Sequence, residues 1–493
     1  MIGTDRPQTS DFAMGKEIEL KLQLDPRAAG QAIQWGEAQG DMTQRVLRSV
    51  YFDTPARSLA MAGLSLRTRY DGAGYIQTVK ATPAAAAGLF SRREWEKDIG
   101  SEQPELGLDT PLAGLPPQTL DALTPLFSLS VERQSVAITI DGSLIEMAID
   151  TGTVAADDRR ADFCEIEFEL KSGNAGVLFA LARELDTLVS LRLGVVTKSE
   201  RGYRLRDALA QSAKADRIRL SPDLSTADSF AAIASACMRQ YRLNEDIVRR
   251  RRSPEALHQA RVGLRRLRSA MTLFKPVFAD DSCSHFNDEL KWLAGTLGAV
   301  RDLDVLYDRA RSDELRLAIS RLRDDAYGAL ADTLDSARAR ALMIDLAEWV
   351  AIGAWRGHEG DNPVGAFAVE RLDKLFRKFK KHSHGLAALN DESRHYVRKL
   401  AKKLRYGSEF FVALYTDKKP AKRHRRFIER LQIVQDQLGT LNDLAAAPHL
   451  LAKNGLNDTE GAQSVISGSG ATDMLEKAEL ARDTLVELRP YWV

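Results

Sequence analysis

Short segments in which charged and apolar side chains alternate are the feature that most constrains the fold of this chain. They recur through about the first 205 residues, at 17–22, 64–70, 136–140 and 165–170, with Asp-Gly turns between some of them. A period of two residues is typical of β-strands, because successive side chains point to opposite faces of a sheet. We therefore predict that this part consists mostly of strands, with one clear helix at 176–189.

The charged faces of these segments are segregated by sign. The sets that share a strand face are Glu17, Glu19 and Lys21; Arg67 and Arg69; Thr78 and Lys80; Arg92, Glu94 and Glu96; Glu146 and Asp150; and Glu165, Glu167 and Glu169. Any one of these faces is most simply explained as the solvated side of an antiparallel sheet. Together they favour a bound ligand, because carboxylates in a row repel unless a cation lies among them. Carboxylate oxygens suit Mg²⁺ or Mn²⁺, and Arg and Lys suit phosphate oxygens.

From about residue 221 onward the apolar period becomes helical, and the sequence contains an internal repeat. Residues 258–268 recur in degenerate form as 395–405, and residues 297–303 recur as 438–444, in the same order and at nearly the same separation. A period this long with only two copies does not fit a solenoid. The repeat indicates a duplicated helical bundle whose two halves face each other.

Each copy of the first block predicts a helix with one basic face and one apolar face, because side chains three and four residues apart share a helical stripe. The two basic stripes are His258, Arg261, Arg265 and Arg268, and His395, Arg398, Lys402 and Arg405. A solvated face is the common explanation of one such stripe. Duplication of the stripe with few interleaved acids favours a linear polyanion as ligand. Nucleic acid is disfavoured, because the nearby aromatic residues fall on apolar faces and form no stacking platform.

The bulk composition fits a cytoplasmic protein in which cysteine does no chemistry. The net charge is +1, but the first 220 residues are net acidic, the rest are net basic, and all 8 histidines lie in the second part. The 3 cysteines are too widely spaced for a disulfide framework or a zinc cluster. No apolar segment is long enough to span a membrane, and the N-terminal segment lacks a signal-peptide pattern.

Over about residues 15–206 the chain resembles the CYTH superfamily, also called triphosphate tunnel metalloenzymes. The matching residues, in family order, are Glu17-x-Glu19-x-Lys21, residues 51–55, residues 63–69, Lys80, Glu94-x-Glu96, Arg133, Asp150, residues 165–169 and Lys198-Ser199. The resemblance implies a closed barrel of about eight antiparallel strands that encloses a charged tunnel.

The same resemblance assigns expected roles to the tunnel residues. The implied metal ligands are Glu17, Glu19, Asp150, Glu165 and Glu167. The implied triphosphate-binding residues are Lys21, Arg67, Arg69 and Lys80, which would also act in catalysis, together with Arg133 and Lys198. Glu94, Glu96 and Glu169 would complete the charge pattern, and Arg48 and Arg92 are weaker candidates. The metal would neutralise charge while water attacks the terminal phosphorus; no general base is identified.

Residues 222–490 resemble the CHAD domain, a helical bundle of two repeats that binds inorganic polyphosphate. The repeats are expected at about 222–355 and 365–490, and residues 207–221 are expected to form a linker. The resemblance implies that all eight residues of the two basic stripes bind polyphosphate and that Asp302 and Asp443 orient basic side chains. The second block has Asn442 where the first has Arg301, which puts a binding role for position 442 in doubt.

We therefore expect a multidomain α+β protein, with an N-terminal antiparallel closed β-barrel and a C-terminal duplicated all-α helical bundle. The expected function is hydrolysis of inorganic triphosphate to pyrophosphate and phosphate with Mg²⁺ or Mn²⁺, accompanied by binding of inorganic polyphosphate. Association with polyphosphate granules is left open. Other open alternatives are a thiamine or nucleoside triphosphate as substrate, cyclisation of ATP, an RNA 5′-triphosphatase, and a polyphosphate-binding scaffold without activity.

Overall fold

The computed structural model describes residues 13–81, 87–106, 109–278, 281–357, 362–466 and 470–493. The chain divides into two compact units. One unit contains residues 1–211 and 335–353, and the other contains residues 212–334 and 354–493. Within the described residues, no helix is both long enough and apolar enough to cross a membrane.

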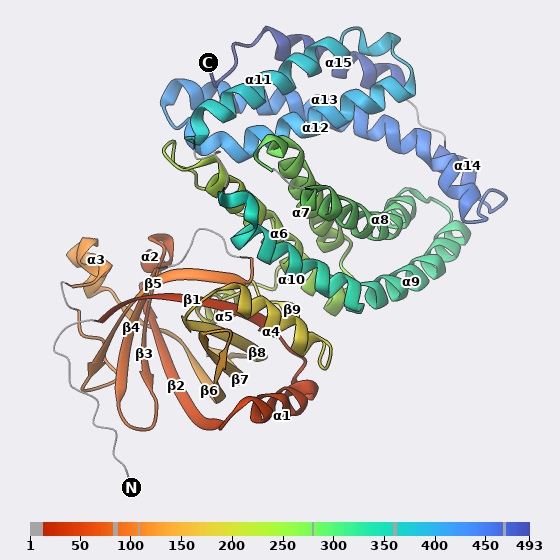
Figure 1. Cartoon of the computed structure of the whole chain (residues 1–493). Coiled ribbons are helices and arrows are strands. Elements are labelled where there is room, and N and C mark those ends of the chain that lie inside the picture. The colour runs from red at the N-terminus through yellow and green to blue at the C-terminus, as the bar shows by residue number, and fades with distance from the viewer. Residues whose placement is uncertain (1–12, 82–86, 107–108, 279–280, 358–361, 467–469) are drawn as a thin grey trace. The chain divides into compact units, whose positions relative to one another are not determined.

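Eight antiparallel strands of the first unit close into a barrel (Figure 1). Their bounds are β1 (Ala13–Gln23), β2 (Thr43–Asp53), β3 (Leu64–Tyr70), β4 (Tyr75–Ala81), β5 (Leu89–Ile99), β6 (Thr124–Ile140), β7 (Ser143–Ala156) and β8 (Arg159–Ser172). The strand order is β5-β4-β3-β2-β6-β7-β8-β1, and pairing of β1 with β5 closes the ring. A two-residue strand, β9 (Arg192–Leu193), also pairs with β1. The predicted closed antiparallel barrel is confirmed.

The apolar face of the predicted strands is the outer wall of this barrel. Leu20 and Leu22 of β1 and Phe168 of β8 have no exposed surface. Helix α4 (Gly176–Asp186) packs against β1 and β8, and helix α1 (Ala29–Gln39) packs against β6 and β7. Because helices cover these apolar side chains, the charged faces point into the barrel.

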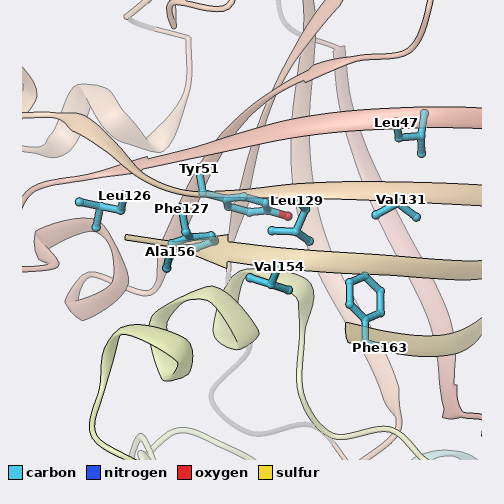
Figure 2. Packing of buried hydrophobic residues seen from close by; sticks show 9 residues of the cluster. All are labelled: Leu47, Tyr51, Leu126, Phe127, Leu129, Val131, Val154, Ala156 and Phe163. Atoms are coloured by element: carbon cyan, nitrogen blue, oxygen red, sulfur yellow. The ribbon is translucent and has the colours of Figure 1, made fainter. Parts of the chain in front are cut away.

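Helix α5 (Lys198–Arg206) packs against β6, β7 and β8 beside an apolar cluster of barrel residues (Figure 2). The side chain of Thr197 caps the helix by accepting a hydrogen bond from the backbone N–H of Glu200. Tyr203 meets the edge of the Phe127 ring, with centroids 5.1 Å apart, and donates its hydroxyl to Asp53 at 2.8 Å. These contacts fix the orientation of α5 and therefore the position of Lys198 at its first turn.

Residues 335–353, which the sequence assigns to the first helical repeat, group with the barrel by their contacts. They contain helix α10 (Ala337–Ile352), which packs against α4 and β9. A largely buried ion pair joins Arg340 Nε to Asp186 Oδ1 at 2.7 Å. The packing partners of α10 lie far from it along the chain, so its helical pattern alone does not reveal them, and the expected domain boundaries stay a prediction.

The second unit is helical, as predicted. Its longer helices are α6 (Thr226–Arg251), α7 (Pro254–Leu273), α8 (Ser282–Arg309), α9 (Asp313–Asp335), α11 (Val364–His382), α12 (Asp391–Phe411), α13 (Lys418–Lys453) and α15 (Ala471–Glu487). Helix α7 packs between α6 and α8, and α12 packs between α11 and α13. The first repeated block lies on α7 and α12, the second lies on α8 and α13, and α7 contacts α12. The sequence repeat thus corresponds to two equivalent sets of three helices.

Gly202 of α5 is expected to be intolerant of a side chain. A Cβ added there would lie 2.1 Å from the buried ring of Phe127, which cannot move without disturbing the cluster in Figure 2. We expect Gly202→Ala to lower the free energy of unfolding by about 1–3 kcal/mol, measured by urea denaturation. Gly30→Ala in α1 is the matched control, because no atom lies within 4 Å of its added Cβ. Equal unfolding midpoints for the two variants would contradict this packing.

Candidate functional site

A cavity of about 380 Å³ lies inside the barrel and is lined largely by charged side chains. Its acidic lining residues are Glu17, Glu19, Asp71, Glu94, Glu96, Glu146, Glu167 and Glu169. Its basic lining residues are Lys21, Arg45, Arg67, Arg69, Lys80, Arg92, Arg133, Lys171 and Lys198. The enclosing walls separate these charges from bulk water, so their mutual interactions are stronger than on an open surface.

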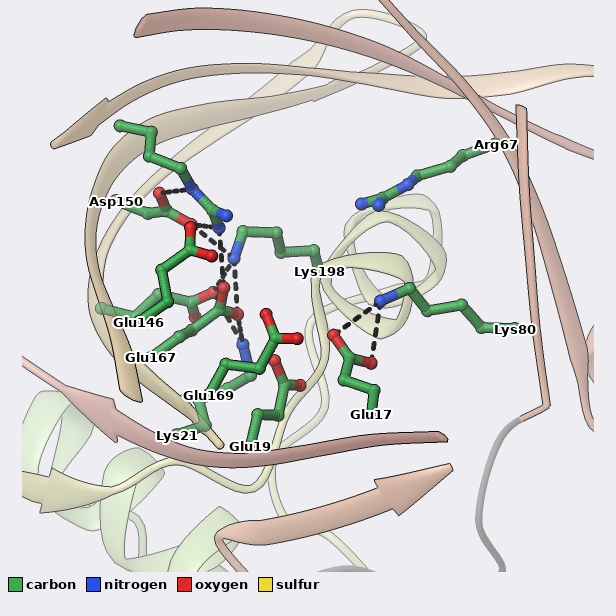
Figure 3. A network of polar contacts seen from close by, with 12 residues as sticks. Glu17, Glu19, Lys21, Arg67, Lys80, Glu146, Asp150, Glu167, Glu169 and Lys198 are labelled. Atoms are coloured by element: carbon green, nitrogen blue, oxygen red, sulfur yellow. Dashed lines mark hydrogen bonds and ion pairs between the residues drawn. The ribbon is translucent and has the colours of Figure 1, made fainter. Parts of the chain in front are cut away.

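Three of the predicted metal ligands form one buried carboxylate cluster. Oxygens of Asp150, Glu165 and Glu167 all lie within 4.8 Å of one another. The ammonium group of Lys198 lies 2.7 Å from an oxygen of each (Figure 3). Burial alone would lower the pKa of Lys198, but the three carboxylates raise it well above its usual range. Hard oxygen donors that already surround a cation fit a divalent metal such as Mg²⁺ or Mn²⁺.

Lys21 and Arg133 neutralise the remaining charge of this cluster. Lys21 has only 1% of its surface exposed, and its ammonium group contacts Glu165 at 3.0 Å and also Glu167. Arg133 donates two hydrogen bonds to Asp150, at 2.7 and 2.6 Å, and one to Glu167 at 2.7 Å. Strand register produces these contacts, since Lys21 lies directly opposite Glu167 and Arg133 directly opposite Asp150.

The other two predicted metal ligands are held by different cations. Glu17 accepts hydrogen bonds from Lys80 at 2.9 Å and from Arg92 at 2.7 Å, and Arg92 also donates to Glu19 at 2.7 Å. Burial raises the pKa of Glu17, but Lys80 and Arg92 outweigh this and hold it well below its usual range. Burial and the nearby Glu167 raise the pKa of Glu19. The five predicted ligands therefore lie in two groups, three around Lys198 and two around Arg92.

The protein compensates the positive charge of the two arginines on β3 to different degrees. Arg67 contacts Glu96 at 3.8 Å, and Tyr51, Glu96 and Glu94 raise its pKa in spite of burial, although its buried Nε has no hydrogen-bond partner. Arg69 forms no ion pair with any residue that the structure describes. Burial, together with Arg67 and Arg133, lowers the pKa of Arg69 to about 10. An anion bound beside β3 would relieve this repulsion, as expected for a phosphate-binding wall.

The structure also places residues whose roles the sequence pattern leaves ambiguous or does not single out. Arg92 lines the cavity directly opposite Glu17, whereas Arg48 is exposed and does not line it. Arg201 is absent from the predicted set, although it lies one helical turn after Lys198 and contacts Glu165 at 2.8 Å. Its i,i+3 spacing from Lys198 is the signal that could have identified it. Glu94, Glu96 and Glu169 line the cavity, as their predicted strand faces require.

A second cavity, of about 830 Å³, lies within the helical unit. The predicted polyphosphate ligands that line it are His258, Arg265, Arg398, Lys402 and Arg405. The other three predicted ligands contact neighbouring side chains: Arg261 with Asp302 at 4.0 Å, Arg268 with Asn287 at 3.1 Å, and His395 with Asn442 at 2.7 Å. The cavity is thus bordered by α7 and α12, one basic helix from each repeat.

Several cations in this second cavity lie close together and lack acidic partners among the described residues. Arg265, Arg398 and Lys402 form no ion pair within the described part of the chain. Burial, Arg265 and Arg398 lower the pKa of Lys402 to about 7. Burial, Arg301 and Arg265 lower the pKa of His258 to about 4, so this histidine is neutral at pH 7. Such depressed values indicate a surplus of positive charge that a bound polyanion would offset.

Lys21 is expected to be essential for stability, because its removal leaves Glu165 and Glu167 without one of their buried partners. We expect Lys21→Met to lower the free energy of unfolding by about 3–5 kcal/mol at pH 7. Lys97→Met is the control, since Lys97 contacts the half-exposed Glu105 at 2.7 Å and exposed pairs contribute about 1 kcal/mol or less. Urea denaturation measures both. Similar losses in the two variants would show that the buried cluster does not depend on Lys21.

Comparison with known proteins finds relatives of both parts of the chain. An inorganic triphosphatase of Haemophilus influenzae is 32% identical over 199 residues, which cover 39% of this chain and 55% of that protein. The match thus spans about half of that relative's length. An uncharacterized protein of Mycobacterium tuberculosis is 26% identical over 479 residues, which cover 89% of this chain and 88% of that protein. The crystal structure of the CHAD domain from the plant Ricinus communis is 29% identical, with a TM-score of 0.49, and the match covers 57% of this chain and 98% of that one.

Two family matches complete the comparison. Residues 15–203, which include nearly all of the barrel and most of α5, match the CYTH domain family. Residues 232–452, which include both basic helices and the repeated blocks beside the second cavity, match the CHAD domain family. The chain therefore belongs to the proteins in which a CYTH domain is followed by a CHAD domain.

Proposed function

We propose that the CYTH domain hydrolyses inorganic triphosphate to pyrophosphate and phosphate with the help of a divalent metal, and that the CHAD domain binds inorganic polyphosphate. The observation that supports the first part most strongly is the division of charge in the barrel cavity. Buried carboxylates on β7 and β8 offer a cation site, and β3 offers an anion site through the under-compensated Arg69 and the unpartnered Nε of Arg67. A metal-bound phosphate chain needs both kinds of site, and the Haemophilus influenzae relative carries the corresponding name.

In the proposed reaction the protein acts mainly by positioning the phosphate chain and by stabilising its negative charge. Arg67, Arg69 and Lys80 hold the phosphate chain in the cavity and stabilise the charge that develops as the P–O bond breaks. When bound, the divalent cation supplies further neutralisation of the phosphate oxygens. Lys198 lines the cavity and contacts the carboxylate cluster, so its ammonium group is placed to bind either the carboxylates or a phosphate oxygen of the substrate.

The lining of the cavity favours an inorganic substrate over a thiamine or nucleoside triphosphate. Tyr51 is the one aromatic residue among the described residues that line it. Its ring is buried and stacked on Phe127, with centroids 4.9 Å apart, so it is not available to stack on a base. An organic group would find few apolar contacts on these charged walls, whereas phosphate oxygens would find cations.

Phosphate release from tripolyphosphate tests the enzymatic proposal. Wild-type protein with Mg²⁺ or Mn²⁺ should release phosphate, and Glu17→Gln/Glu19→Gln should lower kcat/KM at least about 100-fold, because two of the carboxylates proposed to hold the metal lose their charge. Glu132→Gln is the control, since Glu132 is exposed on the outside of β6. If wild-type protein releases no phosphate from tripolyphosphate, ATP or thiamine triphosphate yet binds polyphosphate, the chain is a scaffold rather than an enzyme.

The pH dependence of polyphosphate binding tests the second part of the proposal. Lys402 has a pKa of about 7 in the free protein, and a bound polyanion favours its charged form. Affinity should therefore be highest below pH 7 and fall as the pH rises, because binding then requires uptake of a proton. We expect about a tenfold loss of affinity between about pH 6.5 and about pH 8.5 at constant ionic strength, measured by calorimetry.

Lys402→Arg provides the matched control for this effect, because a guanidinium group stays charged throughout the range. His258, with a pKa of about 4 in the free protein, titrates mainly below the range measured. A pH profile of Lys402→Arg that is as steep as that of the wild type would show that Lys402 is not the titrating group.

A further inference from the structure

The segment that leaves the CYTH domain is fixed to the CHAD domain well before the first CHAD helix. Ala213 exchanges two hydrogen bonds with the side chain of Asn244 on α6, both at 2.8 Å. Asn244 is fully buried and also donates to the backbone oxygen of Gln240 at 2.7 Å. A buried amide with its donor and acceptor both satisfied by one backbone position holds that position in place.

Two further contacts extend this attachment along the segment. Asp216 accepts a hydrogen bond from Arg239 Nε at 2.8 Å. Ile218 and Leu220 are buried, with 7% and 6% of their surfaces exposed, and Arg219 between them is exposed. Residues 213–220, which the sequence assigns to a linker, are therefore an ordered strip on the surface of the CHAD domain.

This strip forms one wall of the cavity in the helical unit. Residues 214–218 line the cavity together with Arg265 of α7 and Lys402 of α12. Lys214 and Arg217 are exposed, and neither forms an ion pair with a residue described in the structure. The two basic groups thus add positive charge to a cavity in which Lys and Arg side chains already outnumber Asp and Glu side chains.

The acidic residues of the same cavity do not cancel this charge. Asp216 is held by Arg239, and Glu409 accepts a hydrogen bond from Arg405 at 2.8 Å. Asp443 acts on Arg398 and Lys402, but the pKa values of both remain depressed despite it. Asp436, which is exposed, is the fourth carboxylate of the lining, but seven Lys and Arg side chains line the same cavity, so a surplus of positive charge remains for a ligand.

We propose that Lys214 and Arg217 are polyphosphate ligands, so that the segment joining the two domains is itself part of the CHAD binding site. This inference rests on the proposed binding of polyphosphate by the helical unit. Cations then approach the cavity from three separate parts of the chain, α7, α12 and the strip at 213–220. A linear chain of phosphates can reach all three, because each of its units carries charge and no single compact anion needs to touch every wall.

Binding of linear inorganic polyphosphate to the full-length chain tests this assignment. The dissociation constants of the wild type, Lys214→Ala/Arg217→Ala and Arg219→Ala are measured at several salt concentrations. Arg219→Ala is the matched control, because Arg219 is exposed on the same strip but does not line the cavity. The double variant should bind about tenfold more weakly than the wild type. Its plot of log K against log salt should be shallower by about 1.4, because each phosphate charge that a protein neutralises on a single-stranded polyanion contributes about 0.7 to the slope.

The possible results separate the two proposals. A wild type that does not bind polyphosphate overturns the proposed function of the helical unit. A wild type that binds, with the double variant matching Arg219→Ala in affinity and salt dependence, overturns the role of Lys214 and Arg217 alone. Lys214→Gln/Arg217→Gln serves as a second variant that keeps polar side chains on the strip, and an unchanged urea midpoint shows that the fold is retained. Its affinity should fall as far as that of the alanine pair.

Discussion

Neutralisation of charge inside a closed barrel is the constraint on which the rest of the CYTH domain depends. Charges removed from water are costly unless each meets a partner, and here the partners lie on neighbouring strands. Lys21 lies opposite Glu167, and Arg133 lies opposite Asp150. A shift of one residue in either strand would move these side chains to the apolar outer wall. The ion pairs that shape the cavity therefore also specify the register of the barrel.

The sign of each pKa shift distinguishes cations that hold the structure from cations that await a ligand. Arg133 and Lys198 contact carboxylates, and their pKa values are raised in spite of burial. Arg69 and Lys402 lack such partners, and their pKa values fall to about 10 and about 7. The CYTH cavity contains both kinds of cation, as a site for metal and phosphate requires. The described cations of the CHAD cavity whose pKa is shifted are of the second kind, which suits a ligand of phosphate alone.

The sequence predicts the strands and helices, because these depend on the period of apolar side chains within a short segment. It does not predict which distant segments pack together. The alternation at 64–70 matches β3, and the charged faces of β1 and β8 point inward as the pattern requires. Closure of the barrel between β1 and β5 is a pairing of distant segments that periodicity alone does not contain. The contacts of helix α10 are missing from its sequence pattern for the same reason, because the pattern predicts a helix but not its packing against α4 and β9. The strip at 213–220 lacks any period, so only its contacts show that it is ordered.

In each copy of the second repeated block, a glycine lies beside an arginine of the first repeated block. A Cβ added to Gly298 would lie 3.5 Å from Arg261, and one added to Gly439 would lie 3.7 Å from Arg398, so the two glycines occupy equivalent positions beside an arginine of the first block. The blocks then diverge where Asn442 replaces Arg301. Asn442 contacts His395 at 2.7 Å, whereas Arg301, next to burial, is the strongest influence that lowers the pKa of His258. The two copies therefore place a glycine beside an arginine in the same way, while their two histidines have different neighbours.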